Sequence, residues 1–287
     1  MQSGSSEPAW YRALRLMALL PRRPLEFYDR VHSLVATRAE AIGEEQVRYQ
    51  VTAFDRALED LDQHLGGEAR PAVAEAPLGD IEAEVQRRIE ALRPVAPFPL
   101  IHNADFRLAR MAYIACRALR PTAVVETGVA YGVTSAFILK ALAVNGHGEL
   151  HSVDLPPLRR RSEAFIGAAI PEDLRARWRL HRGTGQRVLP TILPRLSDVG
   201  VFVQDSLHTL QNILAELQHV TARLSRPSAV LVDDIQDNAA FARWVDQTRP
   251  AYAAAVGEAE KPALFGVAVL NASAGGPSTS VVAGGAD

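Results

Sequence analysis

The sequence contains only one cysteine, Cys116, so no disulfide can form within the chain. Its place in an apolar helical pattern indicates a core residue, and the lack of a disulfide framework is typical of a reducing compartment. No apolar run reaches membrane-spanning length, and residues 1–8 lack the basic and apolar segments of a signal peptide. We therefore expect a cytoplasmic protein with no membrane contact.

Excess charge of one sign is also lacking, because the formal net charge is -2 at pH 7 over 287 residues. The densest basic run, 159–161, is closely followed by Glu163, so no nucleic-acid surface is predicted. Lys140 and Lys261 are the only lysines among 31 lysines and arginines, which we interpret as codon bias. The length allows one large domain or two ordinary ones.

Residues 10–93 have helical spacing throughout. The clearest stripe has apolar residues spaced 4-3-4-3-4 and stops at Gly66-Gly67; it consists of Val47, Val51, Phe54, Leu58, Leu61 and Leu65. Such a seam needs a partner helix, either within this arm or in a second copy of the chain. We expect residues 1–100 to form a helical arm that covers the site or joins the subunits of a homo-oligomer.

Glycine and proline residues interrupt the helical pattern after this seam. Residues 66–79 are typical of a linker, and a helix follows with Ile81, Val85 and Ile89 on one face before Pro94. Asn103 or Asp105 is expected to cap the next helix. The tail, 274–287, is rich in glycine and serine and is expected to be flexible.

From residue 122 the sequence alternates between candidate strands and helices. The strands are predicted at 122–126, 149–154, 178–182, 200–205 and 228–233, with helical patterns between most neighbours. This βαβ series predicts an α/β fold with a doubly wound, mostly parallel sheet. The third strand alternates polar and apolar residues and should lie at an edge, whereas the fourth and fifth are continuously apolar and should lie inside.

Two glycines, Gly128 and Gly132, interrupt the chain between the first strand and the following helix. We expect Gly128 to clear space for a ligand and Gly132 to open a helix whose free amides attract polar groups. The spacing is GxxxG and not GxGxxG, so the usual dinucleotide fingerprint is absent. A glycine needed only for helix–strand packing is the alternative explanation.

Polar or small residues follow each predicted strand. Because parallel strands end at the same sheet edge, these residues should meet in one crevice: 126–128, Asp154, Gly183-Thr184, Asp205 and Asp233-Asp234. Buried carboxylates need partners, so hydroxyls, amides or a cation must lie between them. Asp154 comes 22 positions after Gly132, an interval typical of a ribose-binding acid, although a helix N-cap is the alternative.

At these residues the chain resembles the class I S-adenosylmethionine-dependent methyltransferases. The resemblance rests on the loop from Glu126 to Gly132, the strand ending at Asp154 and the turn at 182–184. It implies that the loop holds the methionine part, Asp154 the ribose, and Thr184 with Gly185 the adenine side. Many members carry an acidic residue where Thr184 stands. The cofactor-binding residues are then expected to be Glu126, Gly128, Tyr131, Gly132, Ser135, Asp154, Thr184, Gly185 and Asp205.

The resemblance also implies a domain organisation. The family sheet ends in an antiparallel hairpin, for which 253–256 and 264–270 are plausible strands. We expect residues 101–273 to form the catalytic domain, between the arm at 1–100 and the tail at 274–287.

A narrower resemblance lies in Asp205-x-x-His208 together with Asp233-Asp234. It is similar to metal-dependent small-molecule O-methyltransferases of natural-product pathways, including those that act on macrolide sugars. A hard cation such as Mg²⁺, held by Asp205, Asp233 and Asp234, would lower the pKa of a hydroxyl, and His208 would take the proton. Asp205 and His208 are thus the candidate catalytic residues. The alternative is that they only cap and begin a helix.

The sequence therefore favours an enzyme that methylates a hydroxyl of a small, polyhydroxylated acceptor. A nicotinamide-dependent oxidoreductase on a related sheet is one alternative, but no Tyr-x-x-x-Lys pair for hydride transfer is evident. A non-catalytic protein that binds a cofactor or serves as a scaffold through its N-terminal seam is another.

Overall fold

The computed structural model describes residues 9–40, 47–159, 161–271 and 281–282. Nearly all of the tail predicted at 274–287 lies outside these residues. The centre is an eight-stranded sheet with the order β1-β7-β8-β6-β5-β2-β3-β4. Its strands are β1 (Val51–Thr52), β2 (Ala123–Thr127), β3 (Glu149–Asp154), β4 (Trp178–Arg182), β5 (Val199–Gln204), β6 (Leu224–Val232), β7 (Tyr252–Gly257) and β8 (Leu264–Leu270).

The pairing of the strands confirms the predicted doubly wound sheet. Strands β2 to β6 pair in parallel with one another, whereas β8 is antiparallel to both β6 and β7. The polar strand β4 lies at one edge, and the apolar strands β5 and β6 lie inside, as the patterns predicted. Because β8 is antiparallel to both of its neighbours, β7 runs parallel to β6 and ends at the same edge of the sheet.

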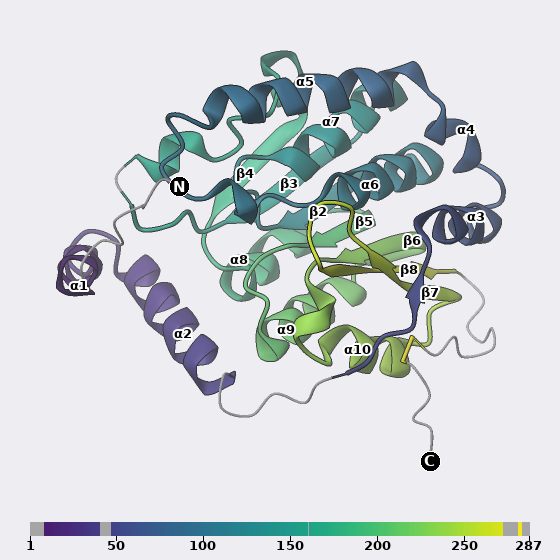
Figure 1. Ribbon diagram of the computed structural model, residues 1–287. Helices are drawn as coiled ribbons and strands as arrows, with labels where there is room; N and C mark the ends of the chain where they lie inside the picture. The colour runs from purple at the N-terminus through teal and green to yellow at the C-terminus, as the bar shows by residue number, and fades with distance from the viewer. Residues whose placement is uncertain (1–8, 41–46, 160, 272–280, 283–287) are drawn as a thin grey trace.

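Helices cover both faces of the sheet (Figure 1). One layer contains α3 (Phe54–His64), α4 (Arg70–Val73), α5 (Ala76–Leu92), α6 (Phe106–Leu119) and α7 (Val133–Asn145). The other contains α8 (Gly185–Ile192), α9 (Leu210–Thr221) and α10 (Ala240–Thr248). The central strands β2 and β5 contribute to both cores, because Val124 and Val201 pack into the first core while Val125 and Phe202 pack into the second.

Local sequence accounts for several helix boundaries. Asp105 caps α6, since its side chain accepts a hydrogen bond from the amide of Arg107 at 2.7 Å. The helix α3 stops before Gly66 and Gly67, both of which have positive φ. None of the helices in the described part of the chain combines the length and the apolar character needed to cross a membrane.

The N-terminal region differs from the prediction of continuous helix. Residues 51–52 form β1, which pairs with β7, and Tyr49 bridges to Val282. The 4-3-4-3-4 stripe is therefore split, with Val51 in a strand and the rest of the stripe from Phe54 onward in or just after α3. The partner of α3 is within the chain: Leu61 is fully buried in the core shared with α6 and α7.

The first two helices stand apart from both layers (Figure 1). They are α1 (Ala9–Met17) and α2 (Pro24–Glu40). Short 3₁₀ helices complete the fold: η1 (Leu100–His102), η2 (Ser162–Phe165), η3 (Glu172–Arg177), η4 (Leu193–Arg195) and η5 (Ile235–Asp237).

Candidate active site

A cavity of about 980 Å³ lies at the carboxyl ends of the parallel strands. Its volume is at the upper end of the range for small-molecule sites, roughly 300–1,000 Å³, so a nucleotide-sized group and a second small molecule can both fit. The wall includes nine residues predicted from the sequence: Gly128, Asp154, Gly183, Thr184, Gly185, Asp205, His208, Asp233 and Asp234. The wall does not include Glu126, Tyr131, Gly132 and Ser135, which were also expected to touch the cofactor.

The glycine after β2 allows close contact between backbone segments. Gly128 has φ +85°, and a Cβ there would lie 1.7 Å from the carbonyl oxygen of Asp205. The amide of Gly128 donates to the carbonyl of Val153 at 2.9 Å, and the amide of Asp205 donates to the carbonyl of Thr127 at 2.7 Å. The space left by the missing Cβ is thus filled by Asp205, and not by a ligand as the sequence suggested.

Asp154 closes the loop after β2 through its side chain. Its Oδ2 accepts hydrogen bonds from the amides of Val129 at 2.7 Å and Ala130 at 3.1 Å. Burial raises the pKa of Asp154, and the two amides oppose that shift. No described residue donates to Oδ1, which leaves this oxygen for a ligand. Asp154 caps no helix, because the next helical segment begins only at Ser162.

Glu126 and Ser135 lie beneath the loop and support it. The hydroxyls of Ser135 and Ser152 both donate to Glu126 Oε2 at 2.7 Å, and the carboxyl group is fully buried. Burial raises the pKa of Glu126 to about 7, although the two serines oppose the shift. In this structure Glu126 connects β2 with α7 and β3.

Tyr131 and Gly132 make contacts within the protein. The Tyr131 hydroxyl donates to the carbonyl of Phe98 at 2.6 Å, and the two rings stack with centroids 4.1 Å apart. A Cβ on Gly132 would lie 2.8 Å from the Cα of Gly167. Gly132 has φ +89° and begins α7, as the sequence predicted, but its close contact is with the turn at 167–170 and not with a strand. Tyr131 positions Phe98, which lines the cavity.

Glu216 on α9 is a wall residue that the sequence analysis missed. It is fully buried, and its carboxylate accepts hydrogen bonds from Thr127 at 2.7 Å and Ser206 at 2.9 Å. Burial raises the pKa of Glu216, and these hydroxyls oppose the shift. A Cβ on Gly185 would lie 2.0 Å from Glu216 Oε1, so only glycine fits beside it. The sequence does contain a signal for this residue, because Glu216 is an acid on the apolar face of the helix, between Ile213 and Leu217.

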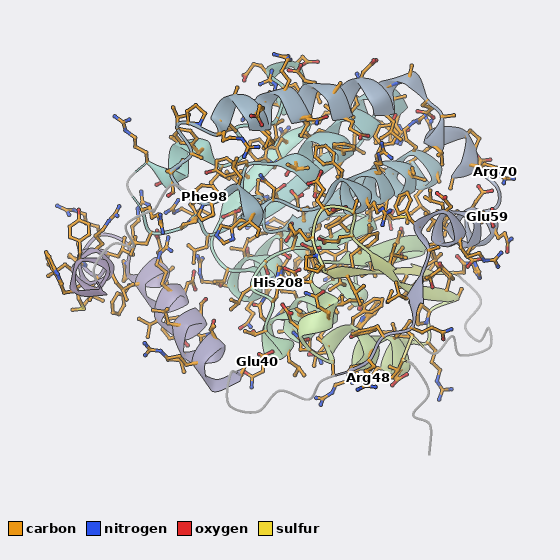
Figure 2. All side chains as sticks on the ribbon, in the orientation of Figure 1. Glu40, Arg48, Glu59, Arg70, Phe98 and His208 are labelled. Carbon is orange, nitrogen blue, oxygen red and sulfur yellow. The ribbon has the colours of Figure 1, made fainter. Side chains whose placement is uncertain are left out.

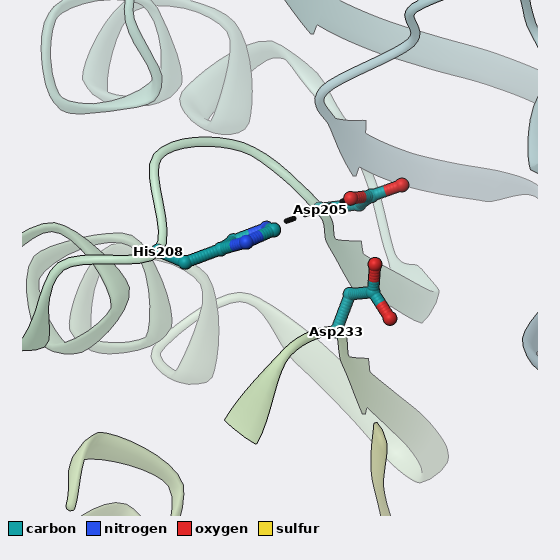
Figure 3. A group of neighbouring side chains, drawn as sticks. All are labelled: Asp205, His208 and Asp233. Atoms are coloured by element: carbon teal, nitrogen blue, oxygen red, sulfur yellow. Dashed lines mark ion pairs between the residues drawn. The ribbon is translucent and has the colours of Figure 1, made fainter. Parts of the chain in front are cut away.

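His208 lies between two carboxylates near the middle of the molecule (Figure 2). Its Nδ1 is 2.8 Å from Asp234 Oδ2, and its Nε2 is 3.5 Å from Asp205 Oδ1 (Figure 3). Burial alone would lower the pKa of His208, but the two acids raise it well above its ordinary value. Asp234 has φ +50°, an unusual backbone conformation that occurs here beside the imidazole.

The carboxylates around Asp233 lack donors. Asp233 Oδ1 and both carboxyl oxygens of Glu258 are buried without a hydrogen-bond partner among the described residues. Burial raises the pKa of Glu258 to about 9, and neighbouring Asp233 adds to the shift. Burial, followed by the charge of Asp233, also raises the pKa of Asp205, although His208 opposes this. Such a cluster requires shared protons or a cation.

The donor atoms of this cluster fit a divalent metal ion. Asp205, His208 and Asp233 can present ligand atoms within 4.8 Å of one another, and so can Asp233, Asp234 and Glu258. Asp233 belongs to both groups, whereas the predicted trio of Asp205, Asp233 and Asp234 is divided between them. Glu258 was missed, yet a signal existed: β7 ends at the same sheet edge as the other parallel strands, and Glu258 directly follows it.

A helix from outside the sheet completes the wall. Arg30, Ser33 and Thr37 of α2 line the cavity. Glu26 of the same helix is buried and forms ion pairs with Arg30 at 2.7 Å and with Arg182 at 3.1 Å. Burial tends to raise the pKa of Glu26, but the two arginines lower it overall. Glu40 lies at the far end of α2 (Figure 2). It accepts a hydrogen bond from the amide of Leu210.

Comparison with known proteins agrees with this architecture. Residues 125–235 match a family model described as a methyltransferase domain. The O-methyltransferase from Bacillus cereus in complex with SAH has 12% identity and a TM-score of 0.54, over 66% of this chain and 91% of that chain. The O-methyltransferase TomG from Streptomyces achromogenes, involved in Tomaymycin synthesis and in complex with SAM, has 13% identity and a TM-score of 0.52, over 66% and 89%. Among curated proteins, no sequence matches.

At these identities the structural likeness shows the fold alone. The sheet order, the antiparallel β8 and the matched segment together establish a class I methyltransferase fold, as the ordered motifs predicted.

Proposed function

We propose that this chain, a class I methyltransferase, transfers the methyl group of S-adenosylmethionine to a hydroxyl of a small, polyhydroxylated acceptor such as a sugar or another natural product. One observation carries the proposal: a single cavity joins Asp154 and the loop after β2 to Asp205, His208 and Asp233. The Bacillus cereus enzyme contains SAH, and TomG contains SAM. TomG is also involved in the synthesis of a natural product.

The donor side would be formed by the ends of β2, β3 and β4. Asp154 Oδ1 is positioned to accept a hydrogen bond from a ribose hydroxyl, because Oδ2 is already bound to the loop amides. Thr184 and Gly185 line the same wall and would lie beside the adenine. Glu126 and Ser135 would support this side from below, and not touch the donor.

The acceptor side would be formed by the ends of β5 and β6. A hydroxyl is a poor nucleophile until its proton leaves, and His208 is the group placed to take that proton. Asp234 binds Nδ1 and orients the ring, so Nε2, which has no hydrogen-bond partner among the described residues, is the accepting atom. Holding the acceptor oxygen in line with the methyl group supplies much of the rate enhancement.

A divalent cation such as Mg²⁺ would be held by Asp233 together either with Asp205 or with Asp234 and Glu258. When bound, such an ion lowers the pKa of a coordinated hydroxyl. The unpartnered oxygens of Asp233 and Glu258 support this assignment, because a cation would satisfy them. A cation beside Asp205 would also weaken the attraction that keeps His208 protonated, which favours the neutral imidazole needed for a base.

Calorimetric titration of the purified protein with S-adenosylmethionine tests the donor. We expect saturable binding at one site per chain, and loss of that binding would refute the proposal as a whole. The same titration with NADH is expected to show no binding, which separates the proposal from the oxidoreductase alternative.

The metal is tested separately, by measuring methyl transfer after treatment with excess chelator. We expect turnover to stop and to return on addition of Mg²⁺. Full activity in chelator would remove Asp205, Asp233 and Asp234 from the ligand role and leave the donor assignment intact.

We also propose that the N-terminal helices join copies of the chain in a homo-oligomer. Large apolar side chains on α1 and α2 are exposed, among them Trp10, Leu14, Leu25 and Tyr28. Light scattering should give a mass above that of one chain for the wild type and a lower mass for a Leu14→Glu, Tyr28→Glu variant. A monomeric wild type would refute this part.

A further inference from the structure

The β7–β8 connection, residues 258–263, carries Glu258 directly after the strand. Glu258 is 8% exposed, and neither of its carboxyl oxygens has a hydrogen-bond partner among the described residues. One of these oxygens lies within 4.8 Å of ligand atoms on Asp233 and Asp234. Because no donor of the described chain holds this side chain, its position depends on how the backbone of the connection is fixed.

Asp105 binds the backbone that follows Glu258. Its Oδ2 accepts hydrogen bonds from the amides of Ala259 at 3.0 Å and Glu260 at 2.7 Å. Asp105 is fully buried, and its other oxygen accepts from the amide of Arg107, which caps α6. A single carboxylate therefore joins the first turn of α6 to the β7–β8 connection.

Arg107 binds the same backbone from the other side. Its Nη1 donates to the carbonyl of Gly257 at 2.9 Å and to that of Glu258 at 3.3 Å. The amide of Glu258 donates to the carbonyl of Ala263 at 3.0 Å. Both backbone groups of Glu258 are thus bound. A side chain that extends from a fixed backbone loses less entropy when it binds an ion, so the carboxylate is prepared for a ligand role.

We propose that Asp105 and Arg107 are positioning residues that hold Glu258 in place as a ligand of the divalent cation. The other ligands in this arrangement are Asp233 and Asp234, and three carboxylates suit a hard cation such as Mg²⁺. Neither positioning residue is part of the cavity wall, so neither acts by touching a substrate. This inference rests on the proposed function, because it concerns the cation of the same site.

The test measures the binding of Mn²⁺ alone to the full-length protein by electron paramagnetic resonance, because Mn²⁺ prefers the same oxygen ligands as Mg²⁺. We expect Glu258→Gln and Asp105→Asn each to weaken Mn²⁺ binding roughly tenfold or more. Asparagine can still cap α6, but its single carbonyl oxygen cannot serve the helix and the connection together. A wild type that does not bind Mn²⁺, or unchanged Mn²⁺ affinity in either variant, would overturn the inference.

The double variant Asp105→Asn, Glu258→Gln separates positioning from a general loss of structure. If Asp105 acts through Glu258, the double variant should bind Mn²⁺ as weakly as Glu258→Gln alone, because Asp105 then has no ligand left to position. Losses of affinity that multiply in the double variant would show that Asp105 acts in another way, and the inference would be wrong.

Asp62→Asn is the matched control for Asp105→Asn. The Oδ1 of Asp62 also accepts hydrogen bonds from two successive amides, those of Ala69 at 2.9 Å and Arg70 at 2.7 Å. These bonds join α3 to the start of α4, and Asp62 is not part of the cavity wall. The control should therefore bind Mn²⁺ as the wild type does.

Arg107→Met should also weaken Mn²⁺ binding, because it removes the bonds to two carbonyls of the connection. Arg110→Met, which breaks the ion pair with Glu82 at 2.6 Å, is its control on the same helix. Affinity for S-adenosylhomocysteine should be unchanged in all these variants. If Asp105→Asn loses affinity for both ligands alike, its effect is structural and the inference is wrong. A wild type that does not bind S-adenosylhomocysteine refutes the proposed function itself, a result independent of the Mn²⁺ titrations.

Discussion

The two sides of the cavity differ in how their buried acids are satisfied. On the donor side, Glu126 has two serine hydroxyls and Asp154 has two backbone amides, all at 2.7–3.1 Å. On the acceptor side, Asp233 and Glu258 keep buried oxygens without any donor among the described residues. In the first arrangement each acid already has protein donors on one oxygen, whereas the second requires a cation or shared protons.

This difference indicates a division of roles. Acids that are bound to the protein itself hold the loop after β2 in one shape, so a donor can bind to a prepared surface. Acids that repel one another are costly to bury. They are found where a bound ion offsets their charge or where they take part in a proton transfer. The comparison predicts that changes on the acceptor side affect turnover, whereas changes on the donor side affect binding and stability.

The largest effect is expected from His208→Gln. The variant retains a polar side chain but cannot take a proton, so kcat should fall on the order of 10²- to 10⁴-fold. Affinity for S-adenosylhomocysteine, measured by calorimetry, should stay near that of the wild type. His219→Gln, on the exposed side of α9, is the control. A kcat equal to that of the wild type would show that His208 is not the base.

Next in size is the effect of Glu126→Gln on stability. The pKa of Glu126 is about 7 in the folded protein and 4.5 ordinarily, so the folded state holds a proton that the unfolded chain releases. Stability is therefore lost as the pH rises from about 4.5 to about 7, by on the order of 3 kcal/mol. Glutamine does not titrate and should abolish this loss.

Urea unfolding of Glu126→Gln and wild type at pH 5 and pH 8 measures the difference. The variant should gain relative to the wild type between the two pH values, whereas Glu59→Gln on exposed α3 should not. A difference that does not change with pH would contradict the assignment of a protonated Glu126.

A smaller effect, on donor affinity, is expected from Asp154→Ala. Loss of the bonds to Val129 and Ala130, and of the ribose contact, should weaken S-adenosylhomocysteine binding roughly 10- to 100-fold. Calorimetry with Asp198→Ala as an exposed control tests this. Mg²⁺ binding should be unchanged, and a parallel loss of Mg²⁺ binding would show that the two sides are not separate.

The smallest effect is expected from Arg187→Met, which breaks the ion pair with Asp29 at 2.8 Å. Because Arg187 is partly exposed, the pair should contribute at most about 1 kcal/mol to holding α2. Limited proteolysis within α2 should become faster, with little change in global unfolding. Arg56→Met, which breaks an exposed pair within α3, should leave the proteolysis of α2 unchanged.

Much of the fold could be predicted because strand and helix periodicity is a local property. The edge position of β4 and the interior positions of β5 and β6 followed from which residues alternate. The N-terminal prediction failed at β1, since two residues in a strand leave no periodic signal and depend on the exposed edge of β7. The structure of residues 51–52 is determined by their pairing with β7, a tertiary contact that the spacing of apolar residues does not predict.

The site divides in the same way. The order of motifs along the chain was sufficient to place Asp154, Asp205, His208 and Asp233 at one edge, because parallel strands end together. It could not show that Glu126 and Tyr131 do not line the cavity, nor that Lys261, to which the sequence gave no role, does. The direction of a side chain beyond a strand end depends on its neighbours.

The sequence by itself determined the doubly wound sheet and the edge where the polar residues gather, because these follow from periodicity and strand direction. Only the tertiary structure decided which acids are already bound and which are not. Asp154 and Asp233 look alike in the sequence, each at the end of a strand. They differ because loop amides reach Asp154, whereas Asp233 faces other carboxylates.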